Sequence, residues 1–314
     1  MDTTHGTSIE FRSVTKSFGD VKAVSNLSFT VEPGVVTGFL GPNGAGKTTT
    51  LRMLLGLVRP TSGTATFAGA AYRDLPSPLT TVGTALEASS FHPGRTARDH
   101  LRVYAAAASI PRERVGTVLD LVGLHDDADR RVGGYSLGMR QRLGLAYALI
   151  GDPGVLVLDE PTNGLDPEGI RWMRGFLRAR AAEGRTVLVS SHQLSEVQQS
   201  VDRVVIITRG EAVYEGALAG LESGARVRVS AVDQQPALAQ ALIAAGAEVH
   251  PDDGVLIATG ITAAQAGAAA LAAGIALSLL APEHAGLEEA FLGLVGADPD
   301  PVDQVAATAT EAAR

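Results

Sequence analysis

A glycine-rich segment carries the residue types that bind phosphate. Residues 41–48 read Gly-Pro-Asn-Gly-Ala-Gly-Lys-Thr, which fits the pattern G-x-x-x-x-G-K-[ST] in full. The glycines allow consecutive backbone N–H groups to curl around phosphate oxygens, and the positive end of a following helix adds to the attraction. Lys47 would neutralise the outer phosphates, and the Thr48 hydroxyl would ligate Mg²⁺. The expected nucleotide contacts of this segment are Gly41, Asn43, Gly44, Ala45, Gly46, Lys47, Thr48 and Thr49.

Two carboxylates follow the apolar run Val155–Leu158. Asp159 is suited to the coordination of Mg²⁺, and Glu160 could orient and polarise an attacking water. Acidic residues are also common where a strand reaches solvent. Because a phosphate loop stands in the same chain, we interpret the pair as part of a site that hydrolyses a triphosphate.

Strands and helices alternate around these residues. The apolar run Val35–Leu40 precedes the phosphate loop, and Thr48–Val58 has helical spacing after it. Such alternation implies right-handed crossovers and a largely parallel sheet, hence an α/β domain. The other expected strands of this domain are Ile9–Val14, Leu27–Val31, Val155–Leu158 and Thr186–Ser190.

The composition changes after Gly224. The following residues predict the order strand, helix, two strands, helix, strand, helix, which favours a small α+β domain of ferredoxin-like type. Its first strand and helix are expected at Val227–Ala231 and Pro236–Ala245. From Ala297 onward the chain is polar and acidic, and we expect it to be disordered.

The stretch Val255–Pro282 contains no charged residue and is long enough to span a bilayer. We predict that it does not, because alanine and glycine dominate it. It divides better into a strand at Val255–Ala258, a helix that Thr262 caps, and a strand at Ile275–Leu280 that ends before Pro282.

The bulk composition excludes several kinds of chemistry. The 314 residues include no cysteine, so disulfides, thiolate metal sites and cysteine nucleophiles are excluded. A formal net charge of −8 gives no electrostatic footprint for nucleic acid. The N-terminal residues lack the basic and apolar regions of a secretory signal, so none is expected.

Residues 135–142, Tyr-Ser-Leu-Gly-Met-Arg-Gln-Arg, lie between the phosphate loop and the acidic strand end. They resemble the signature segment of the ATP-binding cassette (ABC) ATPases, although Leu137 and Met139-Arg140 depart from its commonest sequence, LSGGQ. Ser136 and Gly138 precede a predicted helix, as an anion-binding turn requires. The resemblance implies that this segment contacts the γ-phosphate bound to a second subunit.

Further motifs of that family follow in order over roughly residues 8–220. Residues 161–167, Pro-Thr-Asn-Gly-Leu-Asp-Pro, resemble its D-loop, which implies that Asp166 communicates across a dimer. Ser190-Ser191-His192 resembles the end of the strand that carries the family's switch histidine, so His192 would contact the γ-phosphate. Phe18 matches the aromatic residue that stacks on adenine; a buried core phenylalanine is the alternative.

The family usually places glutamine where this chain has Glu87. The sequence around Glu87 and the later segment Leu287–Leu292 resemble the corresponding segments of the exporter branch of bacitracin and daunorubicin type. A carboxylate at Glu87 could still ligate Mg²⁺. The nearby Arg95, Arg98 and Arg102 could form a partner surface, but a solvated helix face is the favoured interpretation.

The resemblance thus implies an ABC ATP-binding domain over residues 1–222, with a helical subdomain at about 88–150. The small α+β domain would cover 225–296, and 297–314 would be the tail. ATP and Mg²⁺ are the expected cofactors. Glu160 and His192 are the expected catalytic residues, and Thr48, Glu87 and Asp159 the expected metal ligands.

As for partners, the resemblance implies a homodimer on the cytoplasmic face of the membrane that powers export of a drug or antibiotic through a separate permease. A soluble ABC ATPase acting on a nucleic-acid or ribosomal partner is the alternative, which the acidic balance and the single signature disfavour. The C-terminal domain could instead bind a regulatory small molecule or mediate dimerisation.

Overall fold

The computed structural model describes residues 6–86, 91–194, 198–221, 225–252, 254–284 and 287–295. The chain divides into two compact units, Met1–Leu221 and Glu222–Arg314. The predictions for Glu87 and for the tail 297–314 fall outside the described residues.

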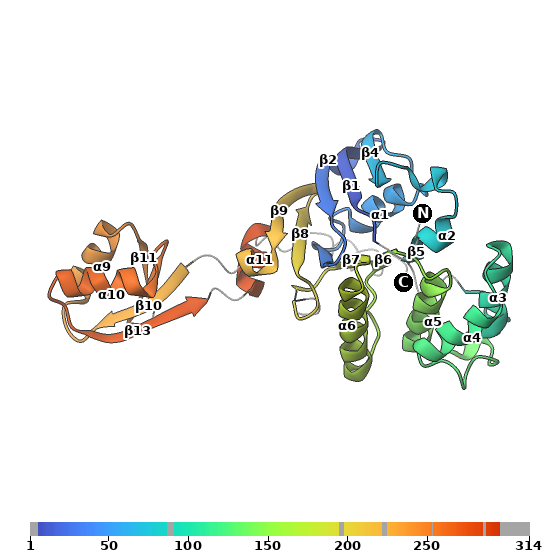
Figure 1. Ribbon diagram of the computed structural model, residues 1–314. Helices are drawn as coiled ribbons and strands as arrows, with labels where there is room; N and C mark the ends of the chain where they lie inside the picture. Colours follow the sequence, from blue (N-terminus) through green and yellow to red (C-terminus); the bar gives the residue numbers. More distant parts are fainter. Residues whose placement is uncertain are drawn as a thin grey trace, which may run out of the picture. The chain divides into compact units, whose positions relative to one another are not determined.

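The first unit is built on a sheet of six strands in the order β5-β6-β7-β3-β8-β9 (Figure 1). Its first five strands in that order run parallel, and β9 joins the edge antiparallel to β8. Every residue of β3, β6 and β7 is buried, as in a parallel sheet covered on both faces. The predicted α/β class is therefore confirmed. The strands are β3 (Val36–Leu40), β5 (Val82–Ala85), β6 (Val155–Asp159), β7 (Thr186–Ser191), β8 (Arg203–Thr208) and β9 (Glu211–Ala217).

A second, antiparallel sheet of three strands has the order β2-β1-β4. Its strands are β1 (Ile9–Phe18), β2 (Val21–Val31) and β4 (Ser62–Phe67). Helix α1 (Lys47–Leu54) lies between the two sheets (Figure 1). Phe29 stacks on Phe11 at 4.3 Å and on Phe39 at 5.2 Å between ring centroids, which joins the two sheets through one core.

Helix α1 is shorter than the helical spacing predicted. It ends at Leu54 rather than near Val58, because Gly56 takes a left-handed backbone with φ of 71°. Strand β1 extends past Val14, its predicted end, and strand β2 begins before Leu27, its predicted start. Their cross-strand pairing, with irregular register near Val14, continues the ladder through polar residues.

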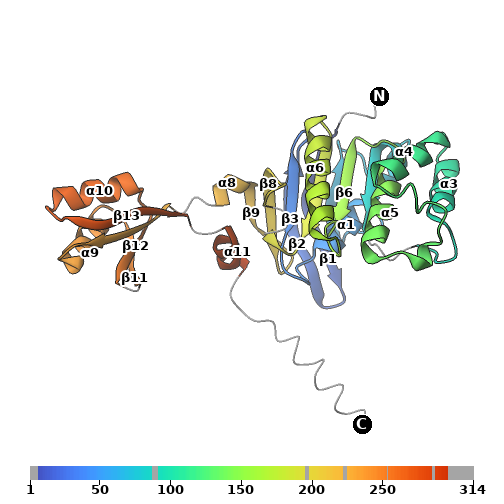
Figure 2. The same ribbon diagram turned by 90° about the horizontal axis from the view of Figure 1, so that it is seen from below.

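The remaining helices of this unit cover the other face of the large sheet or lie beside it. Helices α5 (Leu137–Leu149) and α6 (Pro167–Ala182) lie on the side away from α1, and Figure 2 shows them in front of the strands. The segment predicted as a helical subdomain contains α3, α4 and α5. The other helices among the described residues of this unit are α2 (Pro78–Thr81), α3 (Ala97–Ala107), α4 (Glu113–Leu121) and α8 (Leu218–Leu221), with 3₁₀ turns η1 (Tyr72–Asp74) and η2 (Val132–Gly134).

The second unit contains a four-stranded antiparallel sheet in the order β11-β12-β10-β13. Its elements follow one another as β10 (Ala225–Ala231), α9 (Gln235–Ala244), β11 (Glu248–Asp252), β12 (Val255–Thr259), α10 (Ala263–Ala272), β13 (Leu277–His284) and α11 (Leu287–Val295). This is the predicted βαββαβ order followed by a helix. Leu238 and Leu242 of α9 share one buried cluster with Val227 and Val229 of β10.

The predicted helix cap at Thr262 is confirmed, whereas the predicted strand end before Pro282 is not. Thr262 caps α10 through a complete capping box with Gln265, as expected. The strand end before Pro282 is wrong, because β13 continues to His284 and Pro282 pairs with Val227. β13 is an edge strand of this sheet, where the missing N–H of a proline can be tolerated.

Over the described ranges, the chain has no helix long and apolar enough to cross a bilayer.

Candidate nucleotide and catalytic site

The candidate residues meet at the carboxyl ends of three adjacent strands. The phosphate loop follows β3, Asp159 ends β6 with Glu160 directly after it, and His192 follows β7. In the sheet these strands lie in the order β6-β7-β3, with Asp159 opposite Ser190 and Leu40 opposite Ser191. Parallel strands present their carboxyl ends at one edge, which is where open α/β sheets bind ligands.

Two glycines allow the backbone of the phosphate loop to follow its observed path. Gly46 has φ of 103°, and a Cβ there would lie 2.5 Å from the Ala23 carbonyl oxygen. A Cβ at Gly41 would lie 2.3 Å from the Ile207 carbonyl oxygen. Neither position can hold a larger residue without moving backbone, so the loop keeps its narrow shape.

The loop leads directly into the N-terminus of α1. Gly46 occupies the N-cap position and has no side chain that could cap the helix. The first helical bond runs from the Thr50 N–H to the Gly46 carbonyl. The amides of residues 47–49 therefore precede that bond, and the positive end of the helix can meet an anion. Asn43 and Gly44 are exposed, Thr49 is half-buried, and Ala45 is buried with its carbonyl accepting from the Gly210 N–H at 3.0 Å.

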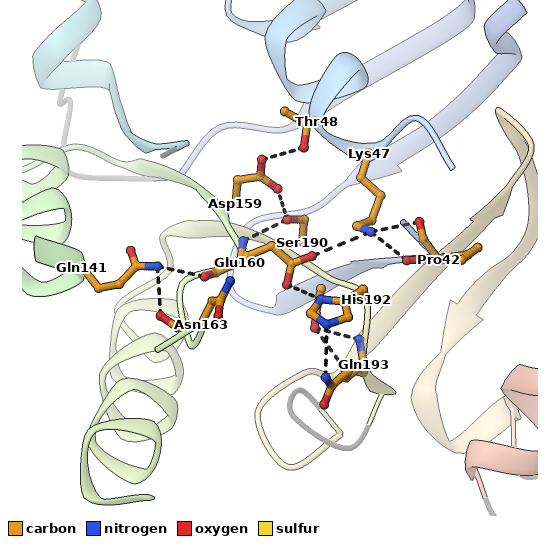
Figure 3. Close-up of polar contacts among 12 residues, drawn as sticks. Pro42, Lys47, Thr48, Gln141, Asp159, Glu160, Asn163, Ser190, His192 and Gln193 are labelled. Carbon is orange, nitrogen blue, oxygen red and sulfur yellow. Dashed lines mark hydrogen bonds and ion pairs between the residues drawn. The ribbon is translucent and has the colours of Figure 1, made fainter. Parts of the chain in front are cut away.

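Lys47 lies folded onto its own loop. Its Nζ donates to the carbonyl oxygens of Gly41 at 2.7 Å and Pro42 at 3.3 Å, and lies 3.7 Å from Glu160 Oε1 (Figure 3). Burial lowers the pKa of Lys47, although the charges of Glu160 and Asp159 act against that shift. The ammonium group therefore loses hydration on burial, and its nearest partners are two carbonyl oxygens and one carboxylate.

Thr48 and Asp159 are in direct contact. The Thr48 hydroxyl donates to Asp159 Oδ2 at 2.8 Å, and the Ser190 hydroxyl hydrogen-bonds to Asp159 Oδ1. The structure thus brings together the two predicted metal ligands that it describes. Asp159 is nearly buried, and Ser190 holds its second oxygen, so the carboxylate has one defined orientation.

Glu160 has an unusual backbone and two side-chain partners. Its φ is 49°, in the left-handed region that costs most non-glycine residues energy. Its N–H donates to Ser190 Oγ at 3.0 Å, while Oε2 lies 2.9 Å from His192 Nδ1. Gln193 Nε2 lies 3.1 Å from His192 Nε2. Since an amide nitrogen only donates, the ring in its neutral form would accept at Nε2 and donate its Nδ1 proton to Glu160.

Three residues of this cluster were not among the predicted site residues. Ser190 orients Asp159 and Glu160, and Gln193 selects the tautomer of His192. Gln141, on α5, donates to the carbonyl oxygens of Glu160 at 3.3 Å and Asn163 at 3.2 Å (Figure 3). In the sequence, only their positions pointed to the site: Ser190 and Gln193 lie within two residues of His192, and Gln141 lies in the signature segment.

Ser136, Gly138 and Asp166 line a different hollow of about 320 Å³. Ser136 caps α5 by accepting from the Met139 N–H at 3.2 Å, and Asp166 caps α6 by accepting from the Gly169 N–H at 2.8 Å. Within the described ranges, neither residue takes part in the contacts that join Lys47, Glu160 and His192.

Phe18 and the arginines near residue 100 lie at the surface. The Phe18 ring is 51% exposed at the end of β1, and Lys16 Nζ lies 4.7 Å from its centroid, so the alternative of a core residue is wrong. Arg98 pairs with Asp129 at 2.8 Å and Arg102 with Asp99 at 3.2 Å. These pairs within the chain fit a solvated face.

Comparisons with known proteins agree with this geometry. Residues 24–163 match the family described as ABC transporter, and residues 224–288 match one described as a domain of unknown function. The bacitracin transport ATP-binding protein of Bacillus licheniformis is 44% identical over 212 residues, which cover 67% of this chain and 69% of that protein. Nod factor export ATP-binding protein I of Burkholderia lata is 43% identical over 217 residues, with 67% and 70% covered.

Solved structures share the fold of the first unit. One described as the ATP binding subunit of an ABC transporter has a TM-score of 0.63 at 25% identity and covers 69% of this chain and 92% of its own. Another, described as a dimeric ATP-binding cassette in a post-hydrolysis state bound to ADP and Pi, has a TM-score of 0.61 at 22% identity and covers 67% and 98%. With its phosphate loop, acidic strand end and relatives above 40% identity, the chain belongs to the ABC transporter family, as one of its ATPase subunits.

Proposed function

We propose that this chain is the ATP-hydrolysing subunit of an exporter, that it works as a homodimer, and that it moves cargo through a separate permease. One arrangement supports this most: Lys47, Thr48, Asp159, Glu160 and His192 are joined by contacts at one sheet edge. These are the groups that would hold a triphosphate, its metal ion and an attacking water.

Mg²⁺ fits the residues present. A hydroxyl and a carboxylate, those of Thr48 and Asp159, already lie 2.8 Å apart, and both are oxygen ligands that this ion prefers. Among the described residues, no group of three or more His, Asp or Glu side chains stands ready to hold a metal. The ion would therefore arrive with the phosphates, and it would neutralise charge that develops on their oxygens.

Hydrolysis requires that Lys47 change partners. We propose that Lys47 leaves the Gly41 and Pro42 carbonyls for the outer phosphates, which are stronger partners for a partly buried cation. Glu160 then accepts a proton from water, oriented by the Nδ1–H of His192. For His192 to donate to a phosphate as well, Nε2 must be protonated or Gln193 must withdraw.

The signature hollow supports the homodimer. Ser136 and Gly138 open α5 beside a concave surface of about 320 Å³, apart from the chain's own phosphate loop contacts. In a symmetric dimer, the signature of one subunit would meet the nucleotide on the other, so closure would add contacts that the open form lacks. The solved cassette with ADP and Pi is itself described as dimeric.

A second hollow supports a permease contact. It measures about 290 Å³ and is lined by aromatic rings of Phe91, His100, Tyr104 and Tyr147. These rings touch in series, at 4.9, 5.0 and 4.7 Å between centroids. Burial and then the charge of Arg95 lower the pKa of His100, so its ring is neutral at neutral pH. Such an aromatic surface, which Arg52 and Thr84 also line, suits an amphipathic segment of a membrane protein.

The proposed direction of transport and cargo rest on the named relatives. Two of them carry transport of bacitracin and export of Nod factor in their names. Efflux of a drug, antibiotic or similar hydrophobic compound is the corresponding proposal here, with the subunit on the cytoplasmic face of the membrane. A nucleic-acid or ribosomal partner is disfavoured by the net charge of −8.

We further propose the domain limits 1–222 and 225–296, with the second domain serving dimerisation or regulation. Removing the residues after Gly224 would test that role. A truncated protein that dimerises on ATP as well as the full chain would exclude a part in dimerisation.

Co-expression with a candidate permease tests the exporter proposal. The protein should sediment with membranes only when that permease is present. Tyr104→Ala and Leu57→Ser should weaken this association, since Leu57 is 67% exposed at the rim of the aromatic hollow. Leu271→Ser, at a residue 81% exposed on α10, is the matched control. Equal sedimentation without the permease would contradict the proposal.

A further inference from the structure

Gln141 ties the signature helix to the glutamate at the end of β6. It lies one turn into α5, on the helix that Ser136 caps. Its amide nitrogen donates both protons, to the carbonyl oxygens of Glu160 at 3.3 Å and Asn163 at 3.2 Å. A primary amide has two donors on one planar nitrogen, so this double contact defines how the side chain lies.

The same stretch of backbone is held from several directions. The Glu160 carbonyl also accepts from the Asn163 N–H at 3.1 Å, and the Glu160 N–H donates to Ser190 Oγ at 3.0 Å. The signature segment touches this turn at a second point. A Cβ on Gly164 would lie 2.2 Å from Leu137 Cδ2, so the Leu137 side chain packs directly on the glycine backbone.

Glu160 needs such support because its backbone is strained. A φ of 49° at a non-glycine residue is energetically unfavourable and persists only where the surroundings enforce it. This conformation is the one in which Oε1 lies 3.7 Å from Lys47 Nζ and Oε2 lies 2.9 Å from His192 Nδ1. If the turn relaxed toward ordinary φ, the carboxylate would be redirected away from both partners.

We infer that Gln141 is a positioning residue that holds Glu160 in its left-handed conformation and so couples the signature segment to the glutamate of the same subunit. This inference rests on the proposed role of Glu160. Because Ser136 and Gly138 open the helix that carries Gln141, a nucleotide on the partner subunit that moves this helix would also move Glu160.

Two variants remove the contact in different ways. Gln141→Leu keeps helix propensity and size but has no donor. Gln141→Glu keeps the shape and turns an ionised carboxylate toward two carbonyl oxygens. For either one, kcat for ATP hydrolysis should fall about 10- to 100-fold. The Kd for Mg²⁺ATP should stay within about twofold, because Lys47 and Thr48 are unchanged. The second variant serves if the first does not fold.

A double-mutant cycle gives the readout that a general structural role would not move. In a Glu160→Gln background, either Gln141 variant should cause no further loss of residual hydrolysis, because its target is already disabled. Gln235→Leu is the matched control. That glutamine also bridges two backbone groups, the Ala231 N–H at 2.8 Å and the Gly254 carbonyl at 3.0 Å, within the other unit. Its kcat should match that of the unaltered protein.

The inference is overturned if both Gln141 variants retain kcat within about twofold. It is also overturned if their losses multiply with that of Glu160→Gln, because Gln141 would then act independently of Glu160. Full activity in Glu160→Gln alone would instead refute the proposed role of Glu160, so the two failures can be told apart.

Discussion

Glu160 Oε2 and His192 Nδ1 lie 2.9 Å apart at the carboxyl ends of the neighbouring strands β6 and β7. With Gln193 at Nε2, the imidazole presents an N–H to the carboxylate. The pair therefore has a defined donor and a defined acceptor at this edge of the sheet.

His192→Ala should reduce turnover with little effect on nucleotide binding. The loss removes one hydrogen bond that orients Glu160, so kcat should fall about 10- to 100-fold, as for other misplaced catalytic groups. Steady-state hydrolysis together with nucleotide titration measures both effects. His125→Ala is the control, since His125 pairs with Asp120 on an exposed turn. An unchanged kcat would remove His192 from the mechanism.

Asp159→Asn should raise the Mg²⁺ concentration needed for hydrolysis. An amide retains an oxygen ligand beside Thr48 but loses the charge that attracts the cation. Initial rates measured over a range of Mg²⁺ at constant ATP report the shift. Asp74→Asn, at an exposed residue that pairs with its neighbour Arg73, is the control. Identical Mg²⁺ curves for both variants would argue against a metal-binding role for Asp159.

Lys47→Met should abolish tight nucleotide binding and yet leave the nucleotide-free protein as stable or more stable. Burial lowers the pKa of Lys47, so keeping it charged costs folding free energy at neutral pH. That cost disappears as the pH rises from the lowered folded-state pKa to the ordinary value of 10.5. The unaltered protein should therefore gain stability relative to Lys47→Met over that window.

Urea unfolding of both proteins without nucleotide, at neutral pH and near pH 10, checks this sign. Arg178→Ala, which removes an exposed cation on α6, should show no such pH-dependent difference. A stability of the unaltered protein that falls relative to that of Lys47→Met as the pH rises would contradict the assigned cause of the pKa shift.

Phe18→Ala should weaken ATP binding by about 1–3 kcal/mol, the worth of stacking a base on an aromatic ring. Phe18→Trp should retain affinity, since its ring offers a comparable face. Titration with ATP and with inorganic triphosphate separates the base from the phosphates. Only ATP should lose affinity. Equal losses for both ligands would indicate that Phe18 shapes the loop instead of stacking on adenine.

Much of this site follows from local patterns in the sequence. The phosphate loop needs glycines at close backbone approaches, and Gly41 and Gly46 occupy them. The buried runs of β3, β6 and β7 are continuous apolar segments, so their parallel pairing and the edge at which they end could be predicted. Outside the site, the start of α10 could also be predicted, because threonine is a favoured N-cap residue.

Other features depend on tertiary contacts that no local pattern encodes. The left-handed backbone of Glu160 is supported by Ser190 and Gln141, which come from distant parts of the chain. The approach of Lys47 Nζ to Glu160 Oε1, at 3.7 Å, joins the phosphate loop to the residue that follows β6. Pro282 lies within a strand because β13 happens to be an edge, which only the strand order reveals.

The proposed role of Glu160 is to activate water beside a triphosphate that Lys47 and Thr48 hold. The most direct test compares Mg²⁺ATP binding and hydrolysis in Glu160→Gln, with Glu168→Gln, an exposed acid in the first turn of α6, as control. Glu160→Gln should bind Mg²⁺ATP with unchanged affinity and hydrolyse it about 10²–10⁴ times more slowly. Near-normal hydrolysis in Glu160→Gln would contradict the claim, as would a failure of the unaltered protein to bind Mg²⁺ATP at all.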